Sequence, residues 1–587
     1  MSQNNISVRF DILRNIVLAA LAIIIVRLFF IQIIEHSNWV AKADEQHTIL
    51  ETITPKRGEI YMMDKGDPVA VVLNQTTYQI IIDPAVTEKS VIEDVIDKYA
   101  KDYVVADIND IYSKEGLRYA IVAKNVPRAT AEEIANSGAS AVWLKKTNQR
   151  VYPEGDLASG LVGFVNSDGL GQYGVEGSLN QLLSGKEGLL KTTADVNKVA
   201  LSIGNDNIKI PAEDGKNVVL SVDRSLEKGI EELAVDAINQ TAATNASVLI
   251  MNPNDGKVVA MANLPNYHPD NYGDVTDASA YINYTTEVPY EPASVCKNFA
   301  FSAAINEGLM TPETTYFNQG YEIIDGWKIQ NAEQRSMLYG AISMKTALYW
   351  SLNTGSIYAL KLLGGDPSSI TQAGREKLYD YYYNKFRLGQ ATGIELIEAE
   401  GFIPDPNEGW GRDSVYANMT FGQNLGITMI QTASAFSAVV NGGTYHTPSI
   451  VEGTLENGEI VKESASDSSE KPESEKILSD ETSAMMREML VNNRNYKARA
   501  GIDRPGYAVG GKSGTAQVIK NGAYDDTMSE TVGTYIGYVS TDGELPKYVI
   551  MVKMWGEGQY LDGGIASNLF DSVSNYLIDY YKIKPRI

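Results

Sequence analysis

The chain is poor in the residues that build disulfides and zinc sites. It has one cysteine, Cys296, among 587 residues, which excludes an intramolecular disulfide and a cysteine-based metal site. Its four histidines are scattered without the spacing of metal ligands, which argues against a zinc enzyme. We therefore expect no metal and no other cofactor. The histidines are His36, His47, His268 and His446.

Positive charge is also scarce. Lys and Arg number 50 against 74 Asp and Glu, so the formal net charge is -24. A surface of this sign repels a phosphate backbone, and we expect no nucleic-acid partner. Hydrophobic content of 44% and charged content of 21% are typical of folded protein, and the length predicts several domains.

One long apolar run lies near the N-terminus. Residues 15–34 read NIVLAALAIIIVRLFFIQII, about the length that spans a bilayer. No small-residue cleavage site follows, and the run exceeds the apolar core of a typical signal peptide. The sequence therefore predicts an uncleaved, single-pass transmembrane anchor at residues 15–35, after a tail at residues 1–14.

The charges beside this run predict its orientation. Arg9 and Arg14 precede it, whereas acidic residues from Glu35 onward follow it. By the positive-inside rule, the tail is cytoplasmic and the rest of the chain lies outside the cell membrane. Arg27 lies within the run, where it either extends to the outer interface or contacts a partner helix.

Residues 36–235 predict a mixed α+β, non-catalytic domain. Within it, Gly169–Gly174 (GLGQYG) matches the dinucleotide-binding pattern, but Gly177 and Gly185 interrupt the helix that such a site needs. We interpret this segment as a glycine-rich turn. The predicted elements are strands at Val69–Leu73 and Tyr78–Ile82 with a turn at residues 74–76, and helices at Ser90–Asp102 and Ala129–Asn136.

Residues 240–587 predict a second domain with strands and helices in alternation. A polar, charged stretch at residues 462–476 cannot bury a core and is predicted to be a mobile loop. The other predicted elements are a hairpin of Ala246–Met251 and Lys257–Ala262, helices at Pro292–Ile305, Ile342–Leu363, Thr428–Val440 and Leu569–Tyr581, and strands at Ala508–Val518, Thr534–Tyr538 and Tyr548–Met554.

Three Ser-x-x-Lys patterns are candidates for a nucleophile with its base. A helix places serine and lysine on one face, where an amine of lowered pKa can take the hydroxyl proton. Ser225 with Lys228 lies at or next to a predicted helix start, where serine commonly caps, and Ser468 with Lys471 lies in the predicted loop. Ser294 with Lys297 lies in the predicted helix of the second domain.

Two further patterns follow Ser294 in chain order. Ser351-Leu352-Asn353 places a hydroxyl and an amide two residues apart. Lys512-Ser513-Gly514 lies on a predicted strand, where Lys512 and Gly514 share one face, so that a substrate can lie along the strand edge. Each pattern is weak alone, but their order matches a trio found in β-lactamases and penicillin-binding proteins.

With this trio the chain resembles a class B penicillin-binding protein, a membrane-anchored D,D-transpeptidase. The resemblance implies an anchor, a pedestal or dimerisation-type domain at residues 36–235, and an α/β, serine β-lactamase-like transpeptidase domain at residues 240–587 whose antiparallel sheet is flanked by helices. Ala293 stands where the family has glycine, and Cys296 where it has an aromatic residue. Further matching segments are Arg57–Ile60, Arg150–Pro153, Gly174–Gly177, Tyr290–Pro292, Phe421–Gln423 and Asn441–Gly443.

The resemblance also implies a role for each site residue. Ser294 is the nucleophile, Lys297 is its base, kept neutral by Lys512 and partial desolvation, and Ser351 relays the proton. Asn353 holds Lys297 and the substrate amide. Lys512 and Ser513 bind the substrate carboxylate with Gly514 beside them, and the N–H groups of Ser294 and Thr515 form an oxyanion hole. Cys296 points away from the catalytic face as a buried apolar residue.

The implied partners are peptidoglycan stem peptides, β-lactam antibiotics, a membrane glycosyltransferase of the SEDS class, and other divisome or elongasome membrane proteins. A septal role is favoured over elongation because the chain is compact and lacks appended C-terminal modules. Two other functions remain open at this point: a β-lactam sensor or inactive scaffold on the same fold, and a β-lactamase.

Overall fold

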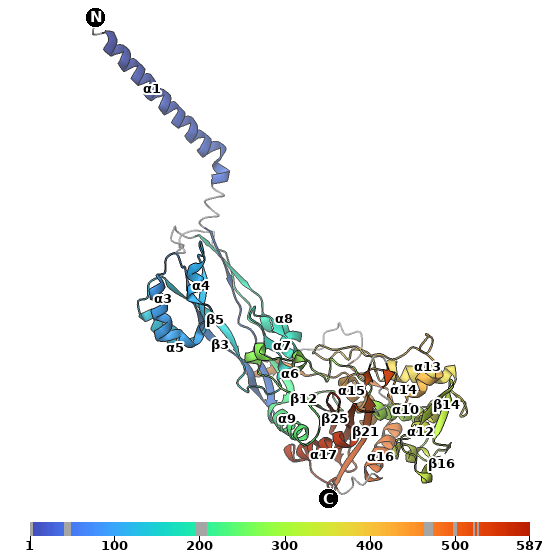
Figure 1. Cartoon of the computed structure of the whole chain (residues 1–587). Coiled ribbons are helices and arrows are strands. Elements are labelled where there is room, and N and C mark those ends of the chain that lie inside the picture. The colour runs from blue at the N-terminus through green and yellow to red at the C-terminus, as the bar shows by residue number, and fades with distance from the viewer. Residues whose placement is uncertain are drawn as a thin grey trace. The chain divides into compact units, whose positions relative to one another are not determined.

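The computed structural model falls into two compact units. Figure 1 shows the chain with many of its helices and strands labelled. The first comprises Met1–Arg57 and Ser184–Gly215, and the second comprises Gly58–Leu183 and Lys216–Ile587. All five residues predicted to be catalytic belong to the second unit. The structure describes residues 4–39, 48–193, 208–462, 473–496, 502–520, 523–524 and 528–586.

The first unit begins with a long helix. α1 (Asn4–Phe29) continues into the π-helical turn η1 (Phe30–Ile34). Within them, Phe10–Ile34 is a 25-residue stretch of mean hydropathy 2.8, long and apolar enough to cross a membrane. The unit also contains an antiparallel sheet in the order β1-β8-β9, from β1 (Thr48–Ile53), β8 (Gly188–Thr193) and β9 (Ile208–Ile210).

The second unit contains a mixed sheet in the order β19-β18-β10-β2-β3-β4, with β5 paired to β3. Helices α3 and α5 pack on it through Ile92 and Ile134. Because β18 and β19 come from residues 451–461, this sheet crosses the boundary predicted near residues 235–240. The strands are β2 (Ile60–Asp64), β3 (Asp67–Ile82), β4 (Ala120–Pro127), β5 (Val142–Val151), β10 (Val218–Asp223), β18 (Val451–Glu456) and β19 (Glu459–Val461).

Short helices and strands connect these elements. The predicted helix at Ser90–Asp102 is present but changes its winding, from α to π to 3-10, along α3, η2 and η3. The connecting elements are α3 (Lys89–Val95), η2 (Ile96–Ala100), η3 (Lys101–Tyr103), α4 (Ile108–Ser113), α5 (Arg128–Asn136), α6 (Ser159–Val162), β6 (Phe164–Val165), β7 (Gly171–Gln172), α7 (Gly174–Ser178) and α8 (Asn180–Ser184).

The turn predicted at residues 74–76 is wrong. Val69–Leu73 and Tyr78–Ile82 belong to the single 16-residue strand β3. Asn74 lies opposite Arg150 on β5, and its Oδ1 accepts a hydrogen bond of 2.9 Å from Arg150 Nη1. Because the partners of these polar side chains come from a distant strand, local composition could not show that β3 continues.

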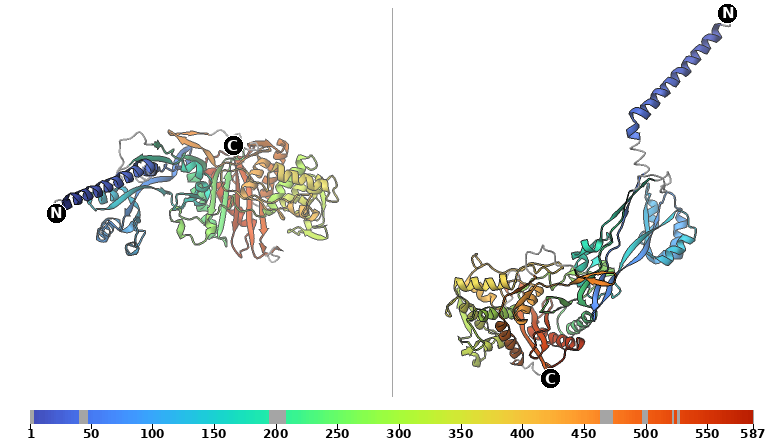
Figure 2. Two further views of the ribbon diagram at one scale, coloured as in Figure 1. Left: turned by 90° about the horizontal axis from the view of Figure 1, so that it is seen from above. Right: turned by 180° about the vertical axis from the view of Figure 1, so that it is seen from behind.

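A five-stranded antiparallel sheet in the order β12-β11-β25-β24-β21 forms the centre of the second predicted domain. Figure 2 shows its green and red strands side by side, although they are far apart in the sequence. The predicted hairpin is confirmed as β11 with β12. The strands are β11 (Asn245–Met251), β12 (Val258–Leu264), β21 (Tyr507–Gln517), β24 (Thr531–Thr541) and β25 (Tyr548–Trp555).

Helices cover both faces of this sheet, as predicted. α9 and α17 pack on the face of Val248 and Ile250. α15 and α16 pack on the opposite face, that of Leu249 and Met251, as the alternation of side chains along a strand requires, and α10 packs against α15 and α16. The helices are α9 (Arg224–Asn239), α10 (Lys297–Asn306), α15 (Met429–Val440), α16 (Asp480–Tyr496) and α17 (Gly563–Tyr580).

Caps decide where two of these helices begin. The capping box at the start of α15 is confirmed, because Thr428 and Gln431 each bond the other's backbone N–H. α17 begins at Gly563 and not at Leu569, since the Asp562 side chain accepts hydrogen bonds from the first turn.

The remaining elements are short helices and strands that connect those already described. Of the loop predicted at residues 462–476, residues 463–472 lie outside the described residues, and Ser474–Lys476 form a strand, β20, paired with β17. The elements are η4 (Pro269–Asp274), η5 (Ala278–Tyr281), β13 (Thr315–Asn318), β14 (Tyr321–Ile324), β15 (Trp327–Gln330), η7 (Ser336–Leu338), β16 (Gly340–Ser343), α11 (Met344–Tyr349), α12 (Asn353–Leu363), α13 (Gln372–Tyr379), η8 (Asp380–Lys385), α14 (Asp413–Met419), β17 (Thr444–His446), β22 (Ile519–Lys520) and β23 (Ala523–Tyr524).

Candidate active site

Ser294 and Lys297 lie where a short 3-10 turn, η6 (Ala293–Cys296), runs into α10. Pro292 directly precedes this turn with a φ of -77°. The turn leaves Ser294 half-buried, whereas Lys297 is fully buried. Lys297 Nζ lies 3.0 Å from Ser294 Oγ, so the predicted contact between the two side chains is confirmed.

Lys297 Nζ also contacts both residues of the second motif. It lies 2.5 Å from the carbonyl oxygen of Ser351 and 3.2 Å from Ser351 Oγ. It lies 2.8 Å from Asn353 Oδ1. The structure therefore gathers Ser294, Lys297, Ser351 and Asn353 around one nitrogen atom.

The four oxygen atoms around this nitrogen differ in chemistry. The two nearest, Ser351 O and Asn353 Oδ1, can only accept hydrogen bonds, whereas the two hydroxyls can also donate. A neutral amine has two N–H donors and one lone pair, so it can donate to both acceptors and accept from a hydroxyl. The arrangement therefore suits a base that takes a proton from Ser294.

Ser351 reaches Lys297 because the helix predicted over Ile342–Leu363 is broken. α11 ends at Tyr349, and α12 begins at Asn353. Ser351 lies between them with a φ of 55°, a left-handed conformation that is strained for serine. The stretch predicted to be helical therefore consists of two helices, and the break between them turns the Ser351 carbonyl toward Lys297.

A second hydrogen bond fixes the amide of Asn353. Its Nδ2 donates to the carbonyl oxygen of Gln330 at the end of β15, at 3.0 Å. This bond directs Oδ1 toward Lys297, because an amide presents its donor and acceptor on opposite sides.

The third motif lies on β21, the edge strand of the central sheet. Lys512 is fully buried, and its Nζ donates to the carbonyl oxygen of Ser513 at 2.9 Å. Ser513 and Thr515 are half-buried, and Thr515 Oγ1 accepts a hydrogen bond of 3.0 Å from Gly563 N at the start of α17.

The absence of a side chain at Gly514 has a different structural role from the one predicted. A Cβ atom at this position would lie 2.6 Å from Pro292 O and 2.5 Å from Thr534 Oγ1. The missing side chain therefore admits the nucleophile's turn against β21, and the space expected for a substrate is filled by protein at that point.

The competing Ser225 has a structural partner. Asp223 and not Ser225 caps α9, and Ser225 Oγ donates to Asp64 Oδ2 at 3.1 Å. Ser468 lies outside the described residues. Among the described residues, no group of three or more His, Cys, Asp and Glu side chains is placed to hold a metal ion.

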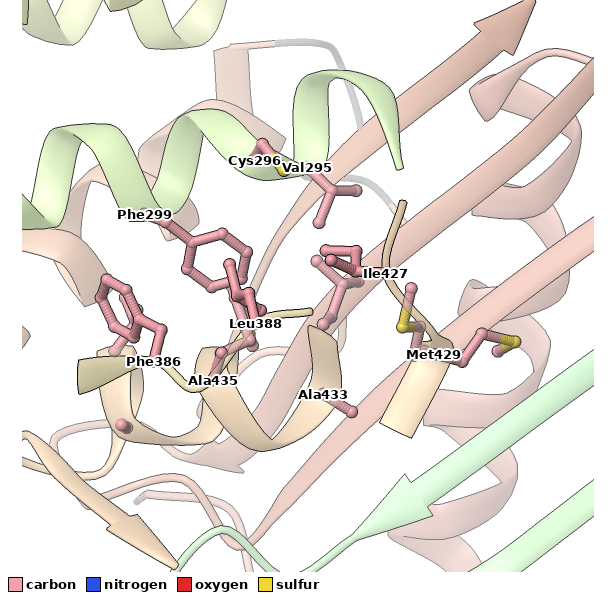
Figure 3. Packing of buried hydrophobic residues seen from close by; sticks show 14 of the residues in the cluster. Val295, Cys296, Phe299, Phe386, Leu388, Ile427, Met429, Ala433 and Ala435 are labelled. Atoms are coloured by element: carbon pink, nitrogen blue, oxygen red, sulfur yellow. The ribbon is translucent and has the colours of Figure 1, made fainter. Parts of the chain in front are cut away.

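Side chains below α10 fix it against the neighbouring helices. Cys296 is fully buried, as predicted, and burial raises the pKa of its thiol. Figure 3 shows Phe299 beside Phe386 and Leu388, and the two phenyl rings lie 5.1 Å apart. This apolar packing holds the helix that carries Lys297.

The sequence missed the loop that supports Ser294 from the other side. Ala293 has a φ of 52°, and its N–H donates to Gly422 O at 3.2 Å. A Cβ atom at Gly422 would lie 2.1 Å from Ala293 O, so only glycine fits there. Gly422 has a positive φ of 82°. The available sequence signal was the segment Phe421–Gln423, which matches the family but gave no role to the loop.

Comparison with protein families matches two parts of the chain. Residues 246–575 match the penicillin binding protein transpeptidase domain, and residues 52–220 match the penicillin-binding protein dimerisation domain. The first match covers more than half of the 587 residues and includes all three motifs of the site.

Individual relatives extend this similarity. The chain is 28% identical over 482 residues to the penicillin-binding protein PbpB of Mycobacterium tuberculosis, spanning 78% of this chain and 66% of the relative. It is 26% identical over 600 residues to the peptidoglycan D,D-transpeptidase FtsI of Escherichia coli, spanning 99% and 93%. Penicillin-binding protein 3 from Mycobacterium tuberculosis in complex with aztreonam has a TM-score of 0.66 at 22% identity, covering 92% and 98%, which shows the shared fold.

Proposed function

Because this chain belongs to the penicillin-binding protein transpeptidases, we propose that it is a peptidoglycan D,D-transpeptidase with Ser294 as its nucleophile. The observation that carries the proposal is the set of contacts at Lys297 Nζ, which lies 3.0 Å from Ser294 Oγ and 2.8 Å from Asn353 Oδ1. A buried amine against a half-buried hydroxyl is the arrangement that activates a serine.

In the first step Ser294 Oγ attacks the carbonyl carbon of a D-Ala-D-Ala stem peptide. Lys297 takes the Ser294 proton, and the C–O bond of an ester forms. Ser351 passes a proton to the departing amine, and the C–N bond to the terminal D-alanine breaks. Ser351 Oγ lies 3.2 Å from Lys297 Nζ, within reach for this relay.

The edge strand β21 orients the substrate during this step. Lys512 and Ser513 bind the terminal carboxylate, and Gly514 keeps the strand close to the nucleophile's turn. The backbone N–H groups of Ser294 and Thr515 stabilise the oxyanion, each by about 3 kcal/mol.

An amine from a second stem peptide completes the reaction. It attacks the ester carbonyl, an amide bond forms, and the bond to Ser294 Oγ breaks as the hydroxyl regains its proton. The product is a cross-link between two peptides. β-Lactams acylate the same serine because they present a similar carbonyl next to a carboxylate.

The apolar helix over Phe10–Ile34 supports membrane attachment of this enzyme. We propose a single-pass anchor with residues 1–14 in the cytoplasm and residues 240–587 outside. A SEDS-class glycosyltransferase and other divisome proteins are the proposed partners, with the anchor and residues 36–235 as the contact surface. We propose septal over lateral wall synthesis, so depletion is expected to give filaments and not rounded cells.

Labelling with a fluorescent penicillin tests the proposed activity. The wild-type protein is expected to form a stable covalent adduct, and Ser294→Ala is expected to form none. Ser225→Ala, which changes the other described Ser-x-x-Lys serine, serves as the matched control and keeps wild-type labelling.

A D-alanine release assay with an added acceptor amine separates the proposal from its alternatives. The transpeptidase releases D-alanine and forms the acceptor adduct. Labelling without turnover would instead indicate a β-lactam sensor, and rapid hydrolysis of the drug would indicate a β-lactamase. No labelling of the wild type would contradict the proposed function.

A further inference from the structure

A closed hydrogen-bond network lies three residues before Ser294. Glu291 Oε1 accepts hydrogen bonds from Tyr524 Oη at 2.7 Å and from the backbone N–H of Asn424 at 2.8 Å. Asn424 Nδ2 in turn donates to Tyr524 Oη at 3.1 Å. One carboxylate oxygen therefore joins three segments that are distant in the sequence.

Each corner of this network belongs to a different part of the site. Glu291 precedes the turn of Ser294. Asn424 follows Gly422, the residue that packs against Ala293. Tyr524 lies on β23, which follows β21 and precedes β24 in the sequence, and β21 carries Lys512. The network thus connects the nucleophile's turn to the supporting loop and to the hairpin that continues β21.

The residues around Ser294 need such support because their backbone is strained. Ala293 has a φ of 52° and Asn424 a φ of 59°. Left-handed residues persist only where the surrounding structure holds them. Backbone hydrogen bonds already join Tyr290 to Ile427 and Ala293 to Gly422.

The Glu291 side chain also connects this turn to the hairpin of β22 and β23, because it accepts a hydrogen bond from Tyr524. It is half-buried, and burial raises the pKa of its carboxyl group, which the hydrogen bonds from Tyr524 and Asn424 partly offset. A partly buried carboxyl group bonded to two segments has little freedom to move.

We propose that Glu291 is a positioning residue for acylation, which fixes the turn of Ser294 relative to β21 through Tyr524 and Asn424. This inference rests on the proposed function, since acylation of Ser294 is the step that it affects. Glu291 touches no reacting atom. It acts by keeping Ser294 Oγ at the distance and angle that attack requires.

Tyr524→Phe tests this role with the smallest change. It removes one hydroxyl and leaves the ring, and we expect the acylation rate constant for fluorescent penicillin to fall about three- to tenfold. The apparent dissociation constant of the drug is expected to stay unchanged, because positioning affects the chemical step.

A matched control exists elsewhere in the same domain. Tyr580 Oη donates to Asp223 Oδ1 at 2.6 Å, a tyrosine–carboxylate hydrogen bond that joins α17 to β10. Tyr580→Phe is expected to be acylated by the drug at the wild-type rate. Comparing thermal midpoints of the two variants separates a loss of positioning from a loss of stability.

A double-mutant cycle tests whether Glu291 and Tyr524 act together. Glu291→Ala is expected to lower the acylation rate constant more than Tyr524→Phe does. In the double variant, adding Tyr524→Phe to Glu291→Ala is expected to lower this rate constant by no more than a further twofold. Glu291→Gln, which keeps a carbonyl acceptor, is expected to recover most of the rate.

Three outcomes would overturn the inference. The first is that Tyr524→Phe is acylated at the wild-type rate, and the second is that the rate losses of the two single variants multiply in the double variant. The third is a rate loss that merely follows a lowered thermal midpoint. Tyr524→Phe alone decides the question if Glu291→Ala does not fold. A wild-type protein that no penicillin acylates would instead contradict the proposed function, so the two failures are distinguishable.

Discussion

Ala293 holds a backbone conformation that suits glycine better than alanine. Its φ of 52° is left-handed, which costs an L-residue about 1–2 kcal/mol. Ala293→Gly is therefore expected to raise the free energy of unfolding by about 0.5–1 kcal/mol, because glycine's greater freedom in the unfolded chain offsets part of the relief. Thermal unfolding measures this change, and a lower midpoint would show that the turn is not strained.

Lys553 is a second residue with an unusual environment. It lies on β25 with 3% of its surface exposed, and its Nζ lies 4.5 Å from the ring centres of both Tyr290 and Trp555. Burial lowers the pKa of Lys553 to about 7. The folded protein therefore binds fewer protons than the unfolded chain between about pH 7 and the ordinary lysine pKa of about 10.4.

This difference predicts a pH dependence of stability. The cost of burying the lysine is full below about pH 7 and falls as pH rises, so stability increases with pH by at most about 1.4 kcal/mol per unit. Lys553→Met is expected to raise the thermal midpoint at about pH 7 and to flatten the rise toward about pH 9. Lys547→Met, at an exposed position, is the control. An unchanged slope in Lys553→Met would contradict this account.

At the scale of single residues the sequence predicted the site well. The order of the three motifs, and the family resemblance that rests on it, identified Ser294, Lys297, Ser351 and Asn353 as candidates. Only the folded chain brings all four together around Lys297 Nζ. Glu291 and Lys553 could not be singled out, since Tyr524, which contacts Glu291, and Tyr290, which contacts Lys553, come from distant segments that only the folded chain brings near.

At the scale of elements, the contact between η6 and β21 depends on Gly514. A Cβ atom there would meet Pro292 O at 2.6 Å. Gly514→Ala is therefore expected to push the nucleophile's turn away from the strand and to slow acylation at least tenfold. Acylation kinetics with fluorescent penicillin measure this effect.

Gly273→Ala is the matched control, because a Cβ atom at Gly273 has nothing within 4 Å. This variant is expected to be acylated by fluorescent penicillin at the wild-type rate. Equal rates for Gly514→Ala and the wild type would show that the close approach of turn and strand is not needed.

The sequence predicted helices and strands best where capping or turn residues mark their ends. The capping box of Thr428 with Gln431 marks the start of α15, and the polar residues between β11 and β12 mark a hairpin. The break at Ser351 had no such signal. Its left-handed conformation is held by tertiary contacts, so the local pattern indicated a helical stretch around Ile342–Leu363 without the break.

At the scale of the whole molecule, a buried ion pair joins the mixed sheet to a helix beside it. Arg150 Nε on β5 lies 2.6 Å from Glu176 Oε1 on α7, and their side chains are 6% and 0% exposed. Arg150→Met leaves the Glu176 charge buried without this partner and is expected to cost about 3–5 kcal/mol. A lowered thermal midpoint checks this.

Arg128→Met is the control for this prediction. Arg128 pairs with Glu132 at 2.8 Å, but both side chains are exposed, at 74% and 59%. Such a pair contributes about 0–1 kcal/mol, so little change is expected. Equal losses in the two arginine variants would contradict the role given to burial.

The domain plan could be predicted only in outline. Anchor, pedestal and catalytic domain follow from hydropathy and from motif order. The pairing of β18 with β10 could not be predicted, because it joins residues 451–456 to residues 218–223 across a long part of the catalytic domain. Long-range strand pairing leaves no mark in local composition.

Peptide mapping of the acyl-enzyme tests the central claim most directly. The protein is incubated with benzylpenicillin, digested, and searched by mass spectrometry for the adduct. We predict that the acyl group is found on the peptide that contains Ser294, and that Lys297→Met greatly reduces its yield. An adduct on Ser225, on Ser468 or on no serine at all would contradict the account.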